Sequence, residues 1–115
     1  MEFGYLEIVT PDVDRVCATL AAASGVEFSD PVPELGHART LRLPTGGRLG
    51  VRAPMRPDES PVVRPYVLVD DVAEAVEVAR REGATIAMGA TEIPGQGTFA
   101  IFIQGGIEFG LWQRE

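Results

Sequence analysis

The sequence is poor in cysteine, histidine and positive charge. It contains one cysteine, Cys17, and one histidine, and its ten basic residues stand against seventeen acidic ones, a formal net charge of −7. This is the wrong sign for neutralising nucleic-acid phosphates or anionic lipid headgroups, so we expect neither nucleic acid nor a membrane as a partner. A single cysteine also excludes an internal disulfide.

Long hydrophobic runs are missing as well. No apolar run approaches the roughly 18 residues of a membrane-spanning helix, and residues 1–5 lack the basic region and apolar stretch that open a secretory signal. We therefore predict a cytoplasmic protein. With 115 residues, 45% of them hydrophobic, the chain is expected to bury one core without disulfides.

The chain contains an internal repeat. Residues 5–25 and 64–83 share one plan, in which an alternating strand is followed by an Asp-Val dipeptide and by a helical stretch closed by glycine. The ends of the two halves also correspond, because 48–52 and 108–112 each follow a Gly-Gly turn. The repeat predicts a module over 1–54, a linker over 55–61 and a second module over 62–115.

Each half reads as strand, helix, strand, strand, strand. Apolar residues at helical spacing predict a helix capped by Asp12 and ended by Gly25, and a second one capped by Asp70 or Asp71 and ended near Gly83. Further strands are predicted over 26–29, 37–43, 84–88 and 98–103. The expected fold class is α+β, with two βαβββ modules whose curved mixed sheets enclose a cavity.

Strand alternation divides the side chains of each sheet between two faces. Leu6 and Ile8 belong to an aliphatic face that must meet a helix, as do Leu49, Val51, Val67, Val69, Phe109 and Leu111. The opposite face is polar and aromatic, and its members are Tyr5, Glu7, Arg48, Gly50, Arg52, Arg64, Tyr66, Glu108, Gly110 and Trp112. Polar groups converging among aromatic rings are typical of a small-ligand pocket, so we predict that this second face lines the cavity.

The paired βαβββ plan resembles the vicinal oxygen chelate superfamily, which includes glyoxalase I, bleomycin-resistance proteins and extradiol dioxygenases. The resemblance covers essentially the whole chain, and residues 5–12, 67–72, 92–99 and 108–113 carry it. In metal-dependent members the ligands come from the first and last strands of each half. Those positions correspond to Tyr5, Gly50, Arg64 and Gly110.

None of these four residues is a good ligand for a divalent metal. The resemblance therefore implies a member of the superfamily without the metal site and with no other cofactor. An alignment shifted by two residues keeps the same face and brings Glu7 and Glu108 to the ligand positions, so a divalent metal stays the alternative. Members of the superfamily often pair halves between chains, which implies a homodimer.

Candidate site residues lie on the polar and aromatic face and on the neighbouring loop. Glu7 and Glu108 are the candidate catalytic residues, because a partly desolvated carboxylate can act as a general base. Their structural alternative is a cross-strand ion pair, of Glu7 with Arg48 or Arg52 and of Arg64 with Glu108. The candidate ligand-binding residues, whose aromatic members equally suit core packing, are Tyr5, Arg52, Arg64, Tyr66, Gln96, Phe99 and Trp112.

Three functions are consistent with these features. The first is a metal-independent binding protein of the bleomycin-resistance type for an aromatic or cationic small molecule. The second is a glyoxalase- or dioxygenase-like enzyme, a lyase, isomerase or oxidoreductase that uses a metal or a glutamate base. The third is an interaction domain whose cavity is packed shut.

Overall fold

The computed structural model describes residues 1–115, which divide into two compact units. The amino-terminal unit comprises Leu6–Val63, and the carboxy-terminal unit comprises Met1–Tyr5 together with Arg64–Glu115. Strand β1 (Phe3–Val9) gives its first residues to the carboxy-terminal unit and its last residues to the amino-terminal unit.

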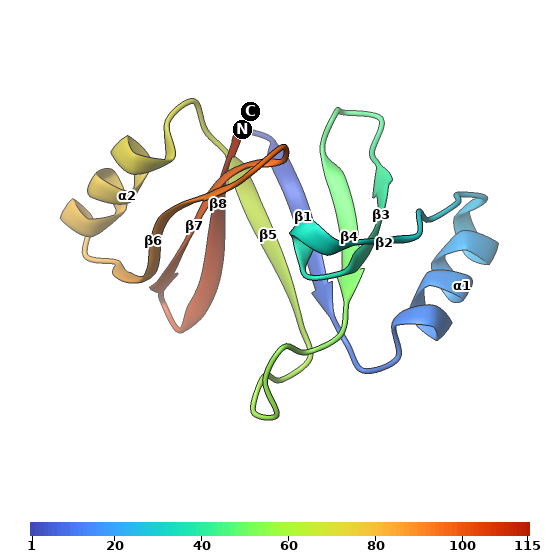
Figure 1. Ribbon diagram of the computed structural model, residues 1–115. Helices are drawn as coiled ribbons and strands as arrows, with labels where there is room; N and C mark the ends of the chain where they lie inside the picture. The colour runs from blue at the N-terminus through green and yellow to red at the C-terminus, as the bar shows by residue number, and fades with distance from the viewer. The chain divides into compact units, whose positions relative to one another are not determined.

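The amino-terminal unit is a sheet with one helix packed on it (Figure 1). Its strands are hydrogen-bonded in the order β2-β3-β4-β1. Helix α1 buries Cys17 against Phe28 and Val51, so this thiol is a core group. The further elements are α1 (Val13–Ser24), β2 (Pro31–Val32), the 3₁₀ turn η1 (Pro33–Leu35), β3 (Ala38–Arg42) and β4 (Arg48–Arg52).

The carboxy-terminal unit repeats this plan with longer strands. Its order is β1-β5-β8-β7-β6, in which β5 and β8 run parallel and β6, β7 and β8 pair antiparallel. Val72 and Val76 of helix α2 pack on Ala100 and Leu111 of the sheet. The elements are β5 (Val62–Leu68), α2 (Val72–Arg81), β6 (Thr85–Ile93), β7 (Gly97–Gln104) and β8 (Ile107–Arg114). The predicted α+β fold, with two βαβββ units and mixed strand pairing, is confirmed.

The two helices begin differently although the sequence repeats. At α2 the Asp71 side chain accepts a hydrogen bond from the backbone N–H of Glu74, at 3.1 Å, which makes Asp71 the cap. Asp12 occupies the same position before α1, but its side chain makes no such bond. The prediction of an Asp12 cap is therefore correct in position and wrong in mechanism. Gly25 ends α1 in the left-handed conformation, at φ 70°, as expected for a glycine there.

Two of the predicted strands differ from the observed ones. Residues 26–29 form no strand, and of their side chains only that of Phe28 is buried in the core. The short β2 comes later in the chain. It begins with Pro31, which an edge strand tolerates. The strand predicted over 84–88 continues to Ile93 as β6. Two register shifts interrupt its pairing with β7, and most of its side chains are exposed, so no regular alternation reveals its length.

The predicted division of the sheet faces is confirmed where the core clusters report it. Ile8, Leu49 and Val51 pack in the cluster under α1, while Val67 and Leu111 pack in the cluster under α2. The opposite face is therefore left for the candidate site residues. No helix of the structure is long and apolar enough to cross a membrane.

Candidate functional site

Four aromatic side chains pack together in the carboxy-terminal unit. The ring centroid of Tyr5 lies 5.8 Å from that of Tyr66 and 5.2 Å from that of Trp112. Tyr66 meets Trp112 and Phe99 edge-on, at 6.1 and 6.2 Å. Tyr5, Tyr66 and Trp112 are each exposed by less than 5%, whereas Phe99 is half-buried. The structure thus brings together all four aromatic residues that the sequence analysis selected.

Glycines make room for these rings. Gly110 is the register partner of Tyr66 between β5 and β8, and a Cβ atom there would overlap the Tyr66 ring. At Gly4 a Cβ would lie 2.8 Å from Cδ1 of Trp112. By strand parity, Gly110 lies on the predicted cavity face, where a glycine could leave space for a ligand. That space is filled by the phenol ring of Tyr66.

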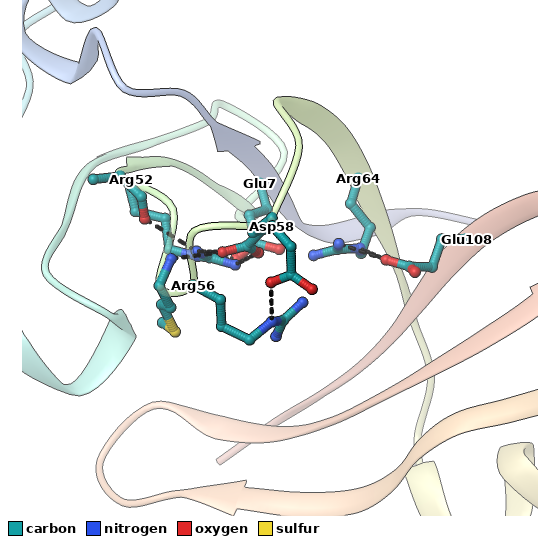
Figure 2. A network of polar contacts seen from close by, with 9 residues as sticks. Glu7, Arg52, Arg56, Asp58, Arg64 and Glu108 are labelled. Carbon is teal, nitrogen blue, oxygen red and sulfur yellow. Dashed lines mark hydrogen bonds and ion pairs between the residues drawn. The ribbon is translucent and has the colours of Figure 1, made fainter.

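Arg64 and Glu108 form an ion pair on the same face of this unit. The Nε of Arg64 donates to Oε1 of Glu108 at 2.8 Å, between neighbouring strands β5 and β8 (Figure 2). The Arg64 side chain is 9% exposed and that of Glu108 39% exposed. The cross-strand pair expected as the structural alternative is present, and the carboxylate of Glu108 is also accessible from solvent.

Gln96 belongs to the turn between β6 and β7. Its backbone N–H donates to the carbonyl of Ile93 at 2.9 Å, and the neighbouring Gly95 N–H donates to the carboxylate of Glu115 at 2.8 Å. The Gln96 side chain is half-buried. The turn is thus tied to the end of the chain, and Phe99 follows it at the start of β7.

Arg52 and Glu7 form a buried ion pair in the amino-terminal unit. The Nε of Arg52 on β4 donates to Oε2 of Glu7 on β1 at 2.8 Å (Figure 2). The exposed fractions of the two side chains are only 7% and 10%. Arg52 is one of the two partners that were expected for Glu7, so the expected cross-strand pair is confirmed.

Glu59 joins this pair from the loop that follows β4. Its two carboxylate oxygens accept from Nη1 and Nη2 of Arg52, at 3.0 and 2.7 Å, which is a bidentate contact. Burial disfavours the charged form of Arg52, but the hydrogen bonds and charges of Glu59 and Glu7 outweigh it and raise the pKa of the guanidinium. The hydrogen bonds from Arg52 lower the pKa of Glu59 to about 2. Both groups are therefore charged throughout the physiological range.

Glu59 is not among the residues predicted for the site, because 55–61 has the composition of a connecting linker. An acidic residue among prolines and polar residues follows no strand or helix periodicity from which a buried side chain could be predicted. A pocket of about 520 Å³ opens beside Glu59. Met55 lines this pocket, and its side chain packs against Gly36. The lining residues are Pro11, Pro54, Met55, Arg56, Pro57, Glu59 and Pro61.

The positions that would hold the metal of the resembled superfamily do not fit a divalent cation. Tyr5 is packed against two other rings, Arg64 is a cation, and Gly110 has no space for a ligating side chain under Tyr66. Gly50 has no side chain at all. Neither unit gathers three or more His, Cys, Asp or Glu side chains in an arrangement suited to a metal ion. We derive no chemical step through a metal at these positions.

The sequence matches no protein-family model and no curated protein, but the structure resembles solved ones. A hypothetical protein of Bacillus halodurans C-125 superposes with a TM-score of 0.79 at 8% identity, over 99% of this chain and 94% of that one. A methylmalonyl-CoA epimerase of Streptomyces coelicolor, in complex with 2-nitronate-propionyl-CoA, gives 0.73 at 14% identity, over the same shares. A protein described as an NAD-dependent benzaldehyde dehydrogenase of Legionella pneumophila gives 0.69 at 12%, over 96% and 98%.

These similarities show the fold, which is the glyoxalase-like fold. The neighbours carry different activities in their descriptions, so the shared fold does not fix an activity for this chain. The chemistry must be argued from its own residues.

Proposed function

We propose that this chain is a member of the vicinal oxygen chelate superfamily that binds a small aromatic or cationic molecule without the superfamily's metal. The single observation that carries the proposal is the replacement of the metal positions by the aromatic cluster and an arginine. Tyr66 occupies the space above Gly110, and Arg64 brings a positive charge where a metal ligand would be needed. An arginine cannot ligate a metal ion, because its guanidinium has N–H donors and no acceptor atom.

The ligand is expected to contact the edge of the cluster at Phe99 and the turn at Gln96, both of which are half-buried. Tyr5, Tyr66 and Trp112 form the rigid aromatic surface behind Phe99, while the carboxylate of Glu108 attracts positive charge. Arg64 orients this carboxylate through its hydrogen bond. Aromatic rings with a fixed orientation favour a planar ligand.

Trp112 is the only tryptophan, so its fluorescence reports on this cluster alone. We expect a saturable change when aromatic cations are titrated into the protein. Phe99→Leu should weaken binding by about fivefold, because a lost aromatic contact costs around 1 kcal/mol. Phe102→Leu is the matched control, since Phe102 lies on the same strand but packs in the cluster under α2. If no compound changes the Trp112 signal, or if both variants weaken binding equally, the proposed binding surface is wrong.

The alternative is a metal-independent enzyme of the epimerase kind, which the similarity to methylmalonyl-CoA epimerases favours. Glu108 is the stronger candidate for its base, because its side chain is 39% exposed against 10% for Glu7. An epimerase must exchange the proton that it removes. Incubation of methylmalonyl-CoA with the protein in heavy water would therefore introduce deuterium next to the carbonyl, and Glu108→Gln would abolish the exchange.

A homodimer and a cytoplasmic location remain predictions of the resemblance and of the composition. Sedimentation at micromolar concentration separates a monomer of 12.3 kDa from a dimer of twice that mass. A monomer that still binds the ligand would show that the site needs no second copy.

A further inference from the structure

The loop between β4 and β5 holds a carboxylate on a buried guanidinium. The Nε of Arg52 donates to Glu7, its Nη1 to Glu59 and to the carbonyl of Ala53, and its Nη2 to the second oxygen of Glu59. Two parallel N–H···O bonds to one carboxylate are the geometry with which arginine recognises carboxylate ligands. Here the carboxylate comes from the protein itself.

The two carboxylates that share Arg52 are held in different ways. Glu7 lies on strand β1, inside the sheet. Glu59 lies in a loop without helix or strand, where its backbone N–H donates to Arg56 at 3.1 Å and its Oε1 accepts from the N–H of Met55 at 2.7 Å. The loop can therefore release Glu59 without disturbing the ladder that positions Glu7.

Glu59 also lines the pocket of about 520 Å³, so it lies between Arg52 and that space. Most of the other lining residues are apolar: four prolines and the side chain of Met55. Arg56 adds a positive charge at the wall, and its side chain is 68% exposed. A molecule that suits these surroundings has an apolar body and one carboxylate.

We propose that Arg52 is a binding site for small carboxylic acids which Glu59 occupies in the absence of ligand. A ligand carboxylate that enters the pocket takes the two hydrogen bonds of Glu59, while Glu7 keeps its bond to Nε. The loop over 53–61 then opens around the ligand. This site lies in the amino-terminal unit and is independent of the function proposed for the aromatic cluster.

Because Glu59 occupies the site in the absence of ligand, the affinity for a carboxylic acid should depend on Glu59. Only molecules with an open loop can bind, so the apparent affinity is reduced by the fraction of open molecules. Removing the Glu59 carboxylate raises that fraction towards one. If the loop is open in fewer than about one molecule in ten, Glu59→Ala strengthens binding by about tenfold or more.

Asp58→Ala is the matched control for this variant. Asp58 is the neighbouring acidic residue in the same loop, its side chain is 84% exposed, and it pairs with Arg56 at 3.3 Å. Its removal deletes the same charge and leaves both carboxylates on Arg52. Any effect of net charge or of a general loosening of the loop would appear in both variants.

The test is a titration of the ¹⁵N-labelled protein and its variants with sodium benzoate, with benzyl alcohol as the neutral probe of the same shape. We expect saturable shifts in the amides of residues 53–61, faster hydrogen exchange at the Met55 amide, and about tenfold or more tighter binding to Glu59→Ala than to Asp58→Ala. Benzyl alcohol should have no such effect.

Equal affinities of the two variants, or benzoate shifts confined to residues 64–115, would overturn the proposal. Circular dichroism shows whether Glu59→Ala is folded. If that variant does not fold, Glu59→Gln, which keeps the shape of the side chain, is used in its place. Failure of benzoate to bind the folded variant would also overturn the proposal, and Trp112 fluorescence shows separately whether the aromatic cluster binds its own ligand.

Discussion

Tyr66 lies directly over Gly110, its register partner in the parallel pairing of β5 and β8, and its ring fills the space that any side chain at residue 110 would require. Gly110 is itself buried, and the Tyr66 ring also packs against Tyr5 and Trp112. The Tyr66 ring can occupy this position because residue 110 has no side chain.

Gly110→Ala should lower the free energy of unfolding by about 2 kcal/mol, since an added methyl group in a packed site forces the ring or the backbone to shift. Gly89→Ala is the matched control, because Gly89 lies on strand β6 with no atom near its missing Cβ. Urea unfolding followed by circular dichroism measures both. In a Tyr66→Ala background the penalty at residue 110 should largely disappear, and a penalty of unchanged size would show that the overlap is not its cause.

Acid should remove the contribution of Glu59 to stability. The pKa of Glu59 is about 2 in the folded chain against an ordinary value of 4.5. A lowered pKa stabilises the fold above the ordinary value, and this contribution is lost as the pH falls from about 4.5 towards 2. The stability difference between the wild type and Glu59→Gln should therefore shrink by about 3 kcal/mol over that range. Denaturant titrations at a series of pH values measure this difference, and a difference independent of pH would contradict the bidentate contact.

The two glutamates of the polar face should differ in their importance for folding. Glu7→Gln leaves the buried Arg52 with one carboxylate fewer and should cost about 3 kcal/mol or more. Glu108→Gln affects a pair whose carboxylate is 39% exposed, so the cost should stay below about 1 kcal/mol. Thermal unfolding of both variants tests the contrast, and similar losses would mean that burial does not set the strength of these pairs.

The repeated helix caps offer a comparison within one chain. Asp71→Ala removes a hydrogen bond to the backbone of Glu74 and should cost about 1 kcal/mol. Asp12→Ala removes no side-chain cap bond and should cost clearly less. Equal losses in urea unfolding would show that both carboxylates act mainly through the helix dipole.

The sequence could predict the fold because the pattern repeats and each strand has one aliphatic face. Val67, Leu111 and Val51 have Tyr66, Trp112 and Arg52 as direct neighbours in the sequence, and this alternation fixes which face meets the helix. Strand ends were harder to predict. Val26 to Phe28 has the local pattern of a strand, but only tertiary pairing decides whether its backbone joins a ladder, and that pairing begins at Pro31.

The candidate site could be predicted only in part. Strand parity placed Tyr5, Tyr66 and Trp112 on one face, and the strand order implied the pair of Arg64 with Glu108. It could not show that Tyr66 fills the space over Gly110, because that depends on a rotamer rather than on a register. Nor could it find Glu59, whose partner Arg52 lies on a strand while Glu59 itself lies in an irregular loop.

The metal content of the purified protein tests most directly whether the superfamily's metal site is absent, as both proposed functions require. Tyr5, Gly50, Arg64 and Gly110 offer no set of oxygen and nitrogen donors for a divalent cation. We therefore expect no stoichiometric metal after purification without chelator. We also expect no rise in melting temperature with Mn²⁺, Ni²⁺, Zn²⁺ or Fe²⁺, because only a ligand that prefers the folded state raises it.

One metal ion per chain would instead show that other residues hold it, with Glu7 and Glu108 as the candidates. Binding there would have to displace Arg52 and Arg64 from these carboxylates. Either Glu7→Gln or Glu108→Gln would then abolish the metal-induced rise in melting temperature, according to which carboxylate holds the metal. In that case a metal-dependent lyase, isomerase or dioxygenase would replace the metal-free binding protein as the best-supported function, since the carboxylates would be metal ligands rather than ion-pair partners.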